Sequence, residues 1–92
     1  MKIGYDPEKR AKTLEDRGID FLDADQVFAG RNVTATDERK DYGETRCITV
    51  GYLGGRVMIV GWVQRGDIRH VFTMRKANDR EIRKYQERLE KA

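Results

Sequence analysis

The chain is poor in the residues that build cross-linked or metal-stabilised folds. Its 92 residues include one cysteine, Cys47, one histidine, His70, and one proline, Pro7. A lone cysteine excludes an intrachain disulfide, and one Cys with one His gives no grouped set of metal ligands. We therefore expect neither a metal ion nor another cofactor.

Long apolar runs are also missing. No stretch approaches the roughly 20 apolar residues of a membrane-spanning helix, and residues 1–5 lack the apolar core of a signal peptide. Hydrophobic residues nevertheless make up 38% of the chain, which is too many for a disordered protein. We expect a single cytoplasmic domain over residues 1–92, with one modest core and no membrane partner.

The charges are unevenly distributed along the chain. Residues 1–45 carry eight Lys or Arg against eleven Asp or Glu, whereas residues 46–92 carry eleven against five. The acidic half suits a basic partner, and the basic half suits a polyanion such as a nucleic acid. A solvated surface of mixed charge is the plainer alternative.

Three strand-like runs organise the chain, at residues 44–52, 56–65 and 68–76. They are joined by Leu53-Gly54-Gly55 and by Arg65-Gly66-Asp67, which are typical hairpin turns because glycine reaches positive φ without steric cost. The middle run is apolar on both faces, so it should be the central strand, in either register. Residues 31–36 favour a further strand, and residues 2–5 form a short edge strand or an extended lead-in.

Helix signals flank these strands. Asp6 is a predicted N-cap for a helix that ends at Gly18, with Ala11 and Leu14 facing inward. A second helix should run from Asp20 to Gly30, with four apolar residues on its inner face: Phe21, Ala24, Val27 and Phe28.

The last helix begins after Asn78, whose spacing from Glu81 predicts a capping box. It should run to about residue 91 with Ile82, Tyr85 and Leu89 inward. The pattern as a whole predicts an α+β domain. Its small antiparallel sheet of three to four strands is flanked by two N-terminal helices and one C-terminal helix.

The polar side chains of the predicted sheet fit metal-independent RNA cleavage. That reaction needs a base for the 2′-hydroxyl, an acid for the leaving 5′-oxygen and cations for the phosphate. Glu44 is the candidate base and His70 the candidate acid. Arg46, Arg75 and Lys76 are candidate phosphate ligands, and Trp62 or Tyr42 could stack on a base.

Each of these roles has a structural alternative. Glu44 and Arg46 could form a surface ion pair, and Trp62 could belong to the core. Strict alternation groups His70 with Ile68, Phe72 and Met74, which would turn it toward the core side. Arg75 is expected to be exposed and to contribute little to stability.

Five stretches, in order along the chain, resemble the BrnT family of type II toxin–antitoxin toxins. They are Tyr5-Asp6-Pro7-Glu8-Lys9, Gly18-Ile19-Asp20-Phe21 with Ala24 and Val27-Phe28, Asp41-Tyr42-Gly43-Glu44-Thr45-Arg46, Thr49-Val50-Gly51 with Gly55-Arg56-Val57, and residues 69–77 followed by Glu81 and Tyr85. The resemblance implies a RelE-like fold and a ribonuclease that inhibits translation. It also implies a BrnA-like antitoxin, through which alone the toxin would meet operator DNA.

The resemblance adds site residues and one alternative. Thr73 stands at a family serine, Arg69 or His70 at a family arginine, and Lys9 would reach the sheet from the first helix. Where the family often has Lys-His, this chain has Asp16-Arg17. That departure favours a second interpretation, a catalytically weak antitoxin-binding module that acts as a co-repressor. Direct DNA binding by the last helix is disfavoured because its apolar residues face inward.

Overall fold

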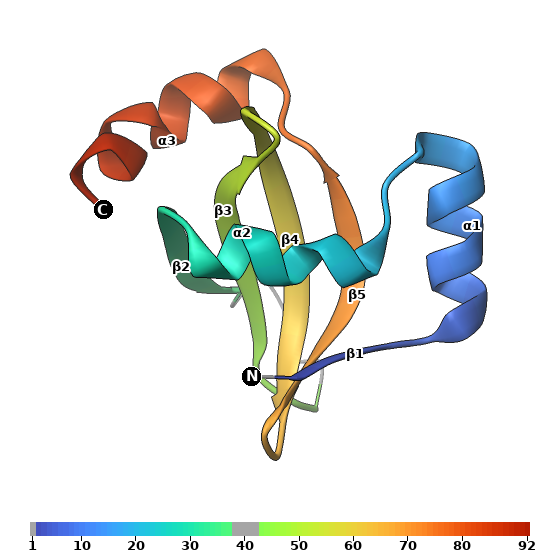
Figure 1. The fold of residues 1–92 in the computed structure, drawn as a ribbon. Coiled ribbons are helices and arrows are strands. Elements are labelled where there is room, and N and C mark those ends of the chain that lie inside the picture. Colours follow the sequence, from blue (N-terminus) through green and yellow to red (C-terminus); the bar gives the residue numbers. More distant parts are fainter. Residues whose placement is uncertain (1, 38–42) are drawn as a thin grey trace.

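A computed structural model describes residues 2–37 and 43–92 and shows an α+β fold (Figure 1). Its elements are β1 (Lys2–Tyr5), α1 (Pro7–Arg17), the 3-10 helix η1 (Phe21–Asp23), α2 (Ala24–Ala29), β2 (Asn32–Asp37), β3 (Arg46–Leu53), β4 (Arg56–Arg65), β5 (Ile68–Lys76) and α3 (Asp79–Lys91). The predicted α+β class is confirmed. The helix expected from Asp20 to Gly30 is instead η1 followed by the shorter α2.

The described strands form one mixed sheet of five, in the order β1-β5-β4-β3-β2. Strands β2 to β5 pair antiparallel, as the hairpin turns predict. β1 pairs parallel with β5, with Lys2 beside Ile68 and Tyr5 beside Val71. The expectation of an antiparallel sheet of three to four strands is therefore wrong in strand number and in this pairing. Strands β1 and β5 are more than 60 residues apart and pair parallel, so no hairpin turn joins them and no turn residues in the sequence indicate the pairing.

The sheet separates two apolar clusters. One face, here called the α2 face, carries Met58, Val60 and Met74 against the four predicted core residues of η1 and α2, which are all buried: Phe21, Ala24, Val27 and Phe28. The other face, the α3 face, carries Val50 and Ile59 against Leu89 of α3. Figure 1 shows α2 crossing the sheet while α3 lies at one end, so part of the α3 face stays uncovered by helices.

Helix α1 has the predicted ends but not the predicted packing. Asp6 caps it by accepting a hydrogen bond from the backbone N–H of Glu8, and Gly18 ends it at φ 67°. The expectation that Ala11 and Leu14 face inward is wrong, because no residue of α1 is buried and Leu14 is 43% exposed. Polar contacts attach the helix instead: Arg10 donates two hydrogen bonds, of 2.8 and 2.9 Å, to the Asp20 carboxylate.

Helix α3 agrees with its sequence signals. The predicted capping box is present, with reciprocal hydrogen bonds between Asn78 and Glu81 of 2.8 and 3.0 Å. Leu89 is buried, and Ile82 and Tyr85 are half-buried on the same side. No helix in the described ranges is both long and apolar enough to cross a membrane.

A β-bulge interrupts the pairing of β4 with β5. Gly61 lies opposite Thr73, whereas the next residue, Trp62, lies opposite Val71. Phe72 is thus the extra residue of β5. Such a bulge shifts the alternation of side chains by one position, and this shift decides which residues of β5 reach the α3 face.

Candidate active site on the α3 face

Cross-strand rows bring four of the predicted catalytic residues to one face. Directly paired residues of an antiparallel sheet project their side chains to the same side. Arg46 pairs with Val63, which pairs with His70. In the next rows Thr73 lies opposite Gly61, and Arg75 lies opposite Ile59. Because Ile59 belongs to the cluster beneath α3, these side chains all project to the α3 face.

The bulge corrects the alternation expected for His70. Strict alternation would have placed His70 with Met74 toward the core. The extra residue Phe72 instead leaves Met74 fully buried on the α2 face and turns His70 the other way, with Thr73 and Arg75. The core alternative for His70 is therefore wrong.

A cleft of about 120 Å³ lies among these rows. Its walls include Asp37, Ile48, Phe72, Thr73 and Arg75, and its floor includes Gly61. A Cβ atom at Gly61 would lie 2.6 Å from the Thr73 methyl and 2.8 Å from the Phe72 ring. The absence of a side chain at this one position thus allows the aromatic ring to lie over the sheet.

Phe72 also fixes the guanidinium of Arg46. The Arg46 Cζ atom lies 4.5 Å from the centre of the Phe72 ring, within the range of a cation–π contact. Arg46 itself is half-buried. The Arg46 Nε atom is itself buried, so the ring and the sheet together hold the guanidinium at this place on the α3 face.

Glu44 lies just before β3 rather than inside it, so its predicted place in a strand is wrong. Its carboxylate accepts hydrogen bonds from Arg65, the shorter of them 3.0 Å. The Arg65 guanidinium, with smaller contributions from Arg46 and His70, lowers the pKa of Glu44. The group is therefore a carboxylate at neutral pH, and a weak base. Its predicted partner in a surface ion pair was Arg46, whereas the ion pair found is with Arg65.

His70 is held toward its neutral form. Burial lowers its pKa below the ordinary 6.5, and the charges of Arg65 and Lys9 lower it further, while Glu44 and Asp6 act in the opposite direction. A neutral imidazole accepts a proton more readily than it donates one. Lys9, a predicted RNA ligand, lies on α1, and its charge is among those that lower the pKa of His70.

Arg75 is engaged by helix α3. Its guanidinium donates two hydrogen bonds, of 2.8 and 2.7 Å, to the carboxylate of Glu81. This contact lowers the pKa of Glu81 to about 2. The expectation that Arg75 is simply exposed is wrong, because it ties β5 to the first turn of α3.

Comparison with protein-family models gives a match over residues 5–81 of the 92-residue chain. The matching model is described as the ribonuclease toxin BrnT of type II toxin–antitoxin systems. The chain belongs to this family. No curated protein matches the chain. Type II systems pair a toxin with an antitoxin, so membership implies an antitoxin partner. The matched range contains every predicted site residue.

Two of the predicted RNA ligands of this BrnT-family chain lie on the opposite face. Trp62 is 7% exposed within the α2-face core and donates a 2.9 Å hydrogen bond to the buried hydroxyl of Thr49. A buried, bonded indole cannot stack on a base, so that role is wrong and the core alternative holds. Arg69 lies over the rings of Trp62 and Phe28, at 4.6 and 4.5 Å, away from the cleft.

Lys76 also projects to the α2 face, because it pairs with Met58 at the end of β5. It is exposed and lies apart from the row of Arg46 and His70. Tyr42, the alternative stacking residue, lies outside the described residues.

Two residues of the site do not follow from the sequence reasoning above. Arg65 is predicted only as the last residue of the strand 56–65 and the first of the following turn, with no role in the site, yet it alternates with Val63 and so shares the face of His70. That signal is present in the sequence. Phe72 has no such signal, because only the bulge brings its ring beneath Arg46.

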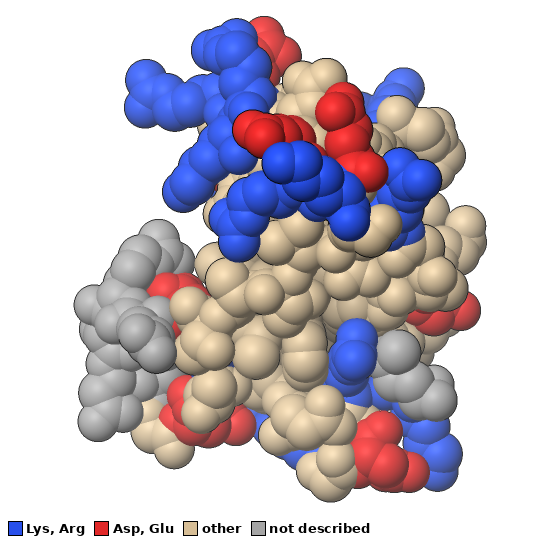
Figure 2. Space-filling view, turned by 90° about the vertical axis from the view of Figure 1, so that its left-hand side faces the viewer, with Lys and Arg blue, Asp and Glu red and all other residues tan. Residues whose placement is uncertain are grey.

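Basic side chains also gather beside this face. Figure 2 shows Lys and Arg side chains, with Asp and Glu among them, gathered at the α3 end of the molecule above a broad surface with few charges. The exposed basic residues of α3 are Arg80, Arg83, Lys84, Arg88 and Lys91. The helix also carries four acidic residues, Asp79, Glu81, Glu87 and Glu90, so α3 borders the covered end of the α3 face with five exposed cations but a net charge of only +1.

Proposed function

We propose that this BrnT-family protein is a metal-independent endoribonuclease that cleaves RNA on the α3 face and thereby inhibits translation. A BrnA-like antitoxin neutralises it, and the toxin meets operator DNA only within that complex. One observation carries the catalytic part of the proposal: the cross-strand row of Arg46, Val63 and His70, beside the cleft of Gly61 and Thr73.

In the proposed reaction the RNA 2′-oxygen attacks the adjacent phosphorus. A 2′-oxygen–phosphorus bond forms, the bond to the 5′-oxygen breaks, and the products are a 2′,3′-cyclic phosphate and a 5′-hydroxyl. His70 takes the 2′-hydroxyl proton, and the imidazolium so formed returns a proton to the 5′-oxygen. This assigns His70 the basic role expected of Glu44 from the sequence, because the lowered pKa of His70 favours the neutral imidazole.

The remaining groups stabilise the negative charge of the transition state. Arg46, whose guanidinium lies over Phe72, brings positive charge to the phosphate, and the Thr73 hydroxyl offers a hydrogen-bond donor. Lys9 adds positive charge from α1. Glu44 holds Arg65 beside His70 through their ion pair, and Arg75 lines the cleft while it anchors α3.

The first test measures cleavage of RNA by the purified protein in the presence of EDTA. We expect Arg46→Gln and His70→Asn each to reduce the rate by roughly 100-fold or more, because each removes a group that acts on the transition state. Lys12→Gln removes an exposed charge on α1 that is not among those shifting the pKa of His70, and it should cleave as the wild type does. Equal activity of all three folded variants would place catalysis elsewhere.

A second function, an antitoxin-binding co-repressor with weak catalysis, is favoured by the ion pairs of the site. Arg75 and Glu44 are both occupied, by Glu81 and Arg65. Expression without the antitoxin separates the two functions. Growth arrest with loss of RNA, abolished by Arg46→Gln, supports the ribonuclease, whereas normal growth at a confirmed level of folded protein supports the co-repressor.

A further inference from the structure

A pocket with basic side chains lies on the α2 face, on the other side of the sheet from the proposed catalytic row. Its cavity measures about 400 Å³. Ile19, Leu53 and Met58 supply its apolar lining, and Arg17, Arg56 and Lys76 its basic side chains. We call it the α2-face pocket.

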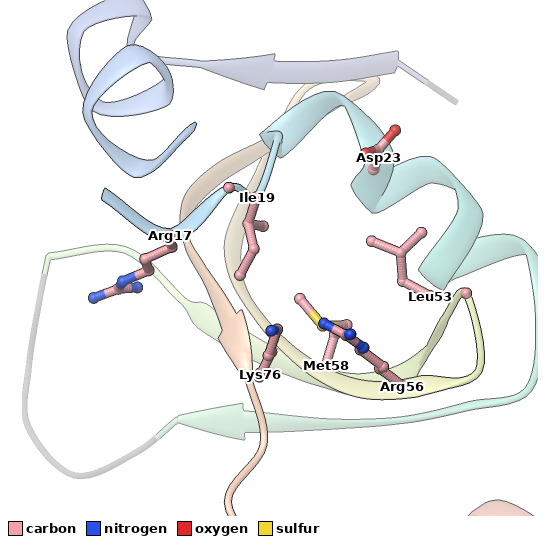
Figure 3. A pocket seen from close by; sticks show the side chains of 9 residues that line it. Arg17, Ile19, Asp23, Leu53, Arg56, Met58 and Lys76 are labelled. Carbon is pink, nitrogen blue, oxygen red and sulfur yellow. The ribbon is translucent and has the colours of Figure 1, made fainter. Parts of the chain in front are cut away.

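The strand register explains why these residues meet. Lys76 lies directly opposite Met58, and Arg56 lies opposite Leu53 and two residues before Met58. Alternation therefore turns Arg56, Met58 and Lys76 to the same side. Figure 3 shows Ile19 and Leu53 pointing into the cavity from opposite sides, with the charged ends of Arg56 and Lys76 beside Met58.

The pocket continues toward helix α3. A second hollow, of about 390 Å³, also includes Arg56 and Lys76 in its lining. Its apolar lining residues are Val57, Ala77 and Ile82. Together the two hollows form a groove with apolar patches at both ends and two cations between them. A groove of this kind fits an elongated ligand better than a single ion.

The cations of the groove are not neutralised by the described part of the protein. Within the described ranges neither Arg56 nor Lys76 forms an ion pair, and Arg17 donates only to the backbone carbonyl of Met74, at 3.3 Å. The carboxylate that lines the pocket is Asp23, which accepts a hydrogen bond from Gln26 and points away from the cavity in Figure 3. The occupant should therefore bring negative charge.

The lining favours a protein segment over RNA. It is aliphatic and thioether in character, and among the residues that the structure describes neither hollow has an aromatic side chain on which a base could stack. The sheet also separates the pocket from the row of Arg46 and His70, so an RNA strand in the pocket would not be held at that row. Apolar side chains flanked by carboxylates match both the lining and the charge.

We infer that the α2-face pocket and its extension dock the antitoxin. The docked segment inserts apolar side chains at Met58 and beside Ala77, and its Asp or Glu side chains pair with Arg56 and Lys76. This inference rests on the proposed function insofar as it takes the partner to be the antitoxin. It adds that the antitoxin is anchored mainly on the α2 face, opposite the catalytic row, and reaches around the end of the sheet to Val57 and Ala77 beside α3.

The test uses the full chain with its cognate antitoxin. The double variant Arg56→Glu/Lys76→Glu reverses both charges at exposed positions and should weaken antitoxin binding at least 10-fold, measured by titration calorimetry. RNA cleavage by the free variant should equal that of the wild type. Lys12→Glu/Lys91→Glu makes the same charge change away from the groove and should bind normally.

Each other outcome overturns the inference. Unchanged antitoxin affinity places the docking surface elsewhere, and loss of RNA cleavage with normal antitoxin binding makes the groove an RNA site. Arg56→Gln/Lys76→Gln removes the charges without reversing them, so it repeats the test if the first variant folds poorly. Failure of the proposed function is seen separately, as a wild-type protein that binds antitoxin and cleaves no RNA.

Discussion

At the scale of single residues, His70 is the group whose surroundings define the site. Its pKa is set by burial first and then by charges from three directions: Arg65 at the end of β4, Glu44 before β3, and Lys9 and Asp6 at the start of α1. These four groups are distant in the sequence, and the fold gathers them around one imidazole. The chain has no other histidine, so this imidazole can be followed alone.

This gives a prediction for the titration of His70. Arg65→Gln removes a positive charge that lowers the pKa of His70, so the pKa should rise; Glu44→Gln removes a negative charge that raises it, so the pKa should fall. The measurement is the NMR shift of the imidazole C–H protons against pH.

Lys12→Gln serves as the control and should leave the titration curve where it is. The acidic limb of the cleavage rate should move with the pKa in both variants, because the neutral imidazole is the proposed base. Shifts of the same sign for Arg65→Gln and Glu44→Gln would contradict the arrangement.

At the scale of elements, the bidentate contact of Arg75 with Glu81 joins the sheet to α3. Glu81 is also the second member of the capping box with Asn78, so one carboxylate stabilises the start of the helix and its attachment to β5. Both interactions depend on a side chain that is only 22% exposed.

Replacing Glu81 by Gln should therefore lower the free energy of unfolding by about 1–2 kcal/mol at pH 7. Glu87→Gln, on the same helix, removes only an exposed ion pair with Lys91 and should cost about 0.5 kcal/mol or less. Urea unfolding measures both. An equal cost for the two variants would show that Arg75 does not anchor the helix.

The ion pair between Arg75 and Glu81 also predicts that the folded chain loses stability in acid. The pKa of Glu81 is about 2 in the folded chain against an ordinary 4.5, so its stabilisation is complete above pH 4.5 and is lost as the pH falls toward 2. Asp20, paired with Arg10, contributes in nearly the same window. Glu81→Gln should lose less stability than the wild type between pH 5 and pH 3, because it has no proton to bind there.

Local signals explain which elements could be predicted from the sequence. The caps at Asp6 and Asn78 and the glycine turns between β3, β4 and β5 act over a few residues, and all were predicted correctly. The pairing of β1 with β5 and the bulge at Phe72 depend on contacts between distant segments, which leave no local pattern.

The same difference explains the errors in the site. Because residues 57–63 are apolar on both faces, the sequence could not say that Trp62 belongs to the α2 face. Arg69 and Lys76 carry the charge expected of RNA ligands, whereas the register turns them away from the site. The faces of Arg46, Thr73 and Arg75 follow from the register and the bulge together, and their catalytic roles stay predictions.

At the scale of the whole molecule, the sheet lies between the proposed catalytic row and the main pocket proposed for the antitoxin. The α3 face carries the proposed catalytic row and is bordered by the basic residues of α3 (Figure 2). The α2 face carries the pocket proposed for the antitoxin (Figure 3). Both faces carry Lys and Arg side chains, so their presence alone cannot tell which face meets RNA. The salt dependence of RNA binding can, because each phosphate that a protein neutralises releases counterions.

We expect Arg80→Gln/Arg83→Gln, on α3, to weaken RNA binding several-fold at low salt. It should also reduce the slope of log affinity against log salt by about 0.7 for each phosphate that the variant no longer neutralises. Arg17→Gln/Arg56→Gln removes the same charge from the α2 face and should change neither quantity. Both the affinity and its salt slope are measured by fluorescence anisotropy with a labelled single-stranded RNA. Every protein in this experiment also carries His70→Asn, so that the RNA is not cleaved. A reduced slope for the α2-face variant instead would mean that RNA crosses both faces, and the sheet would then not separate RNA binding from antitoxin docking.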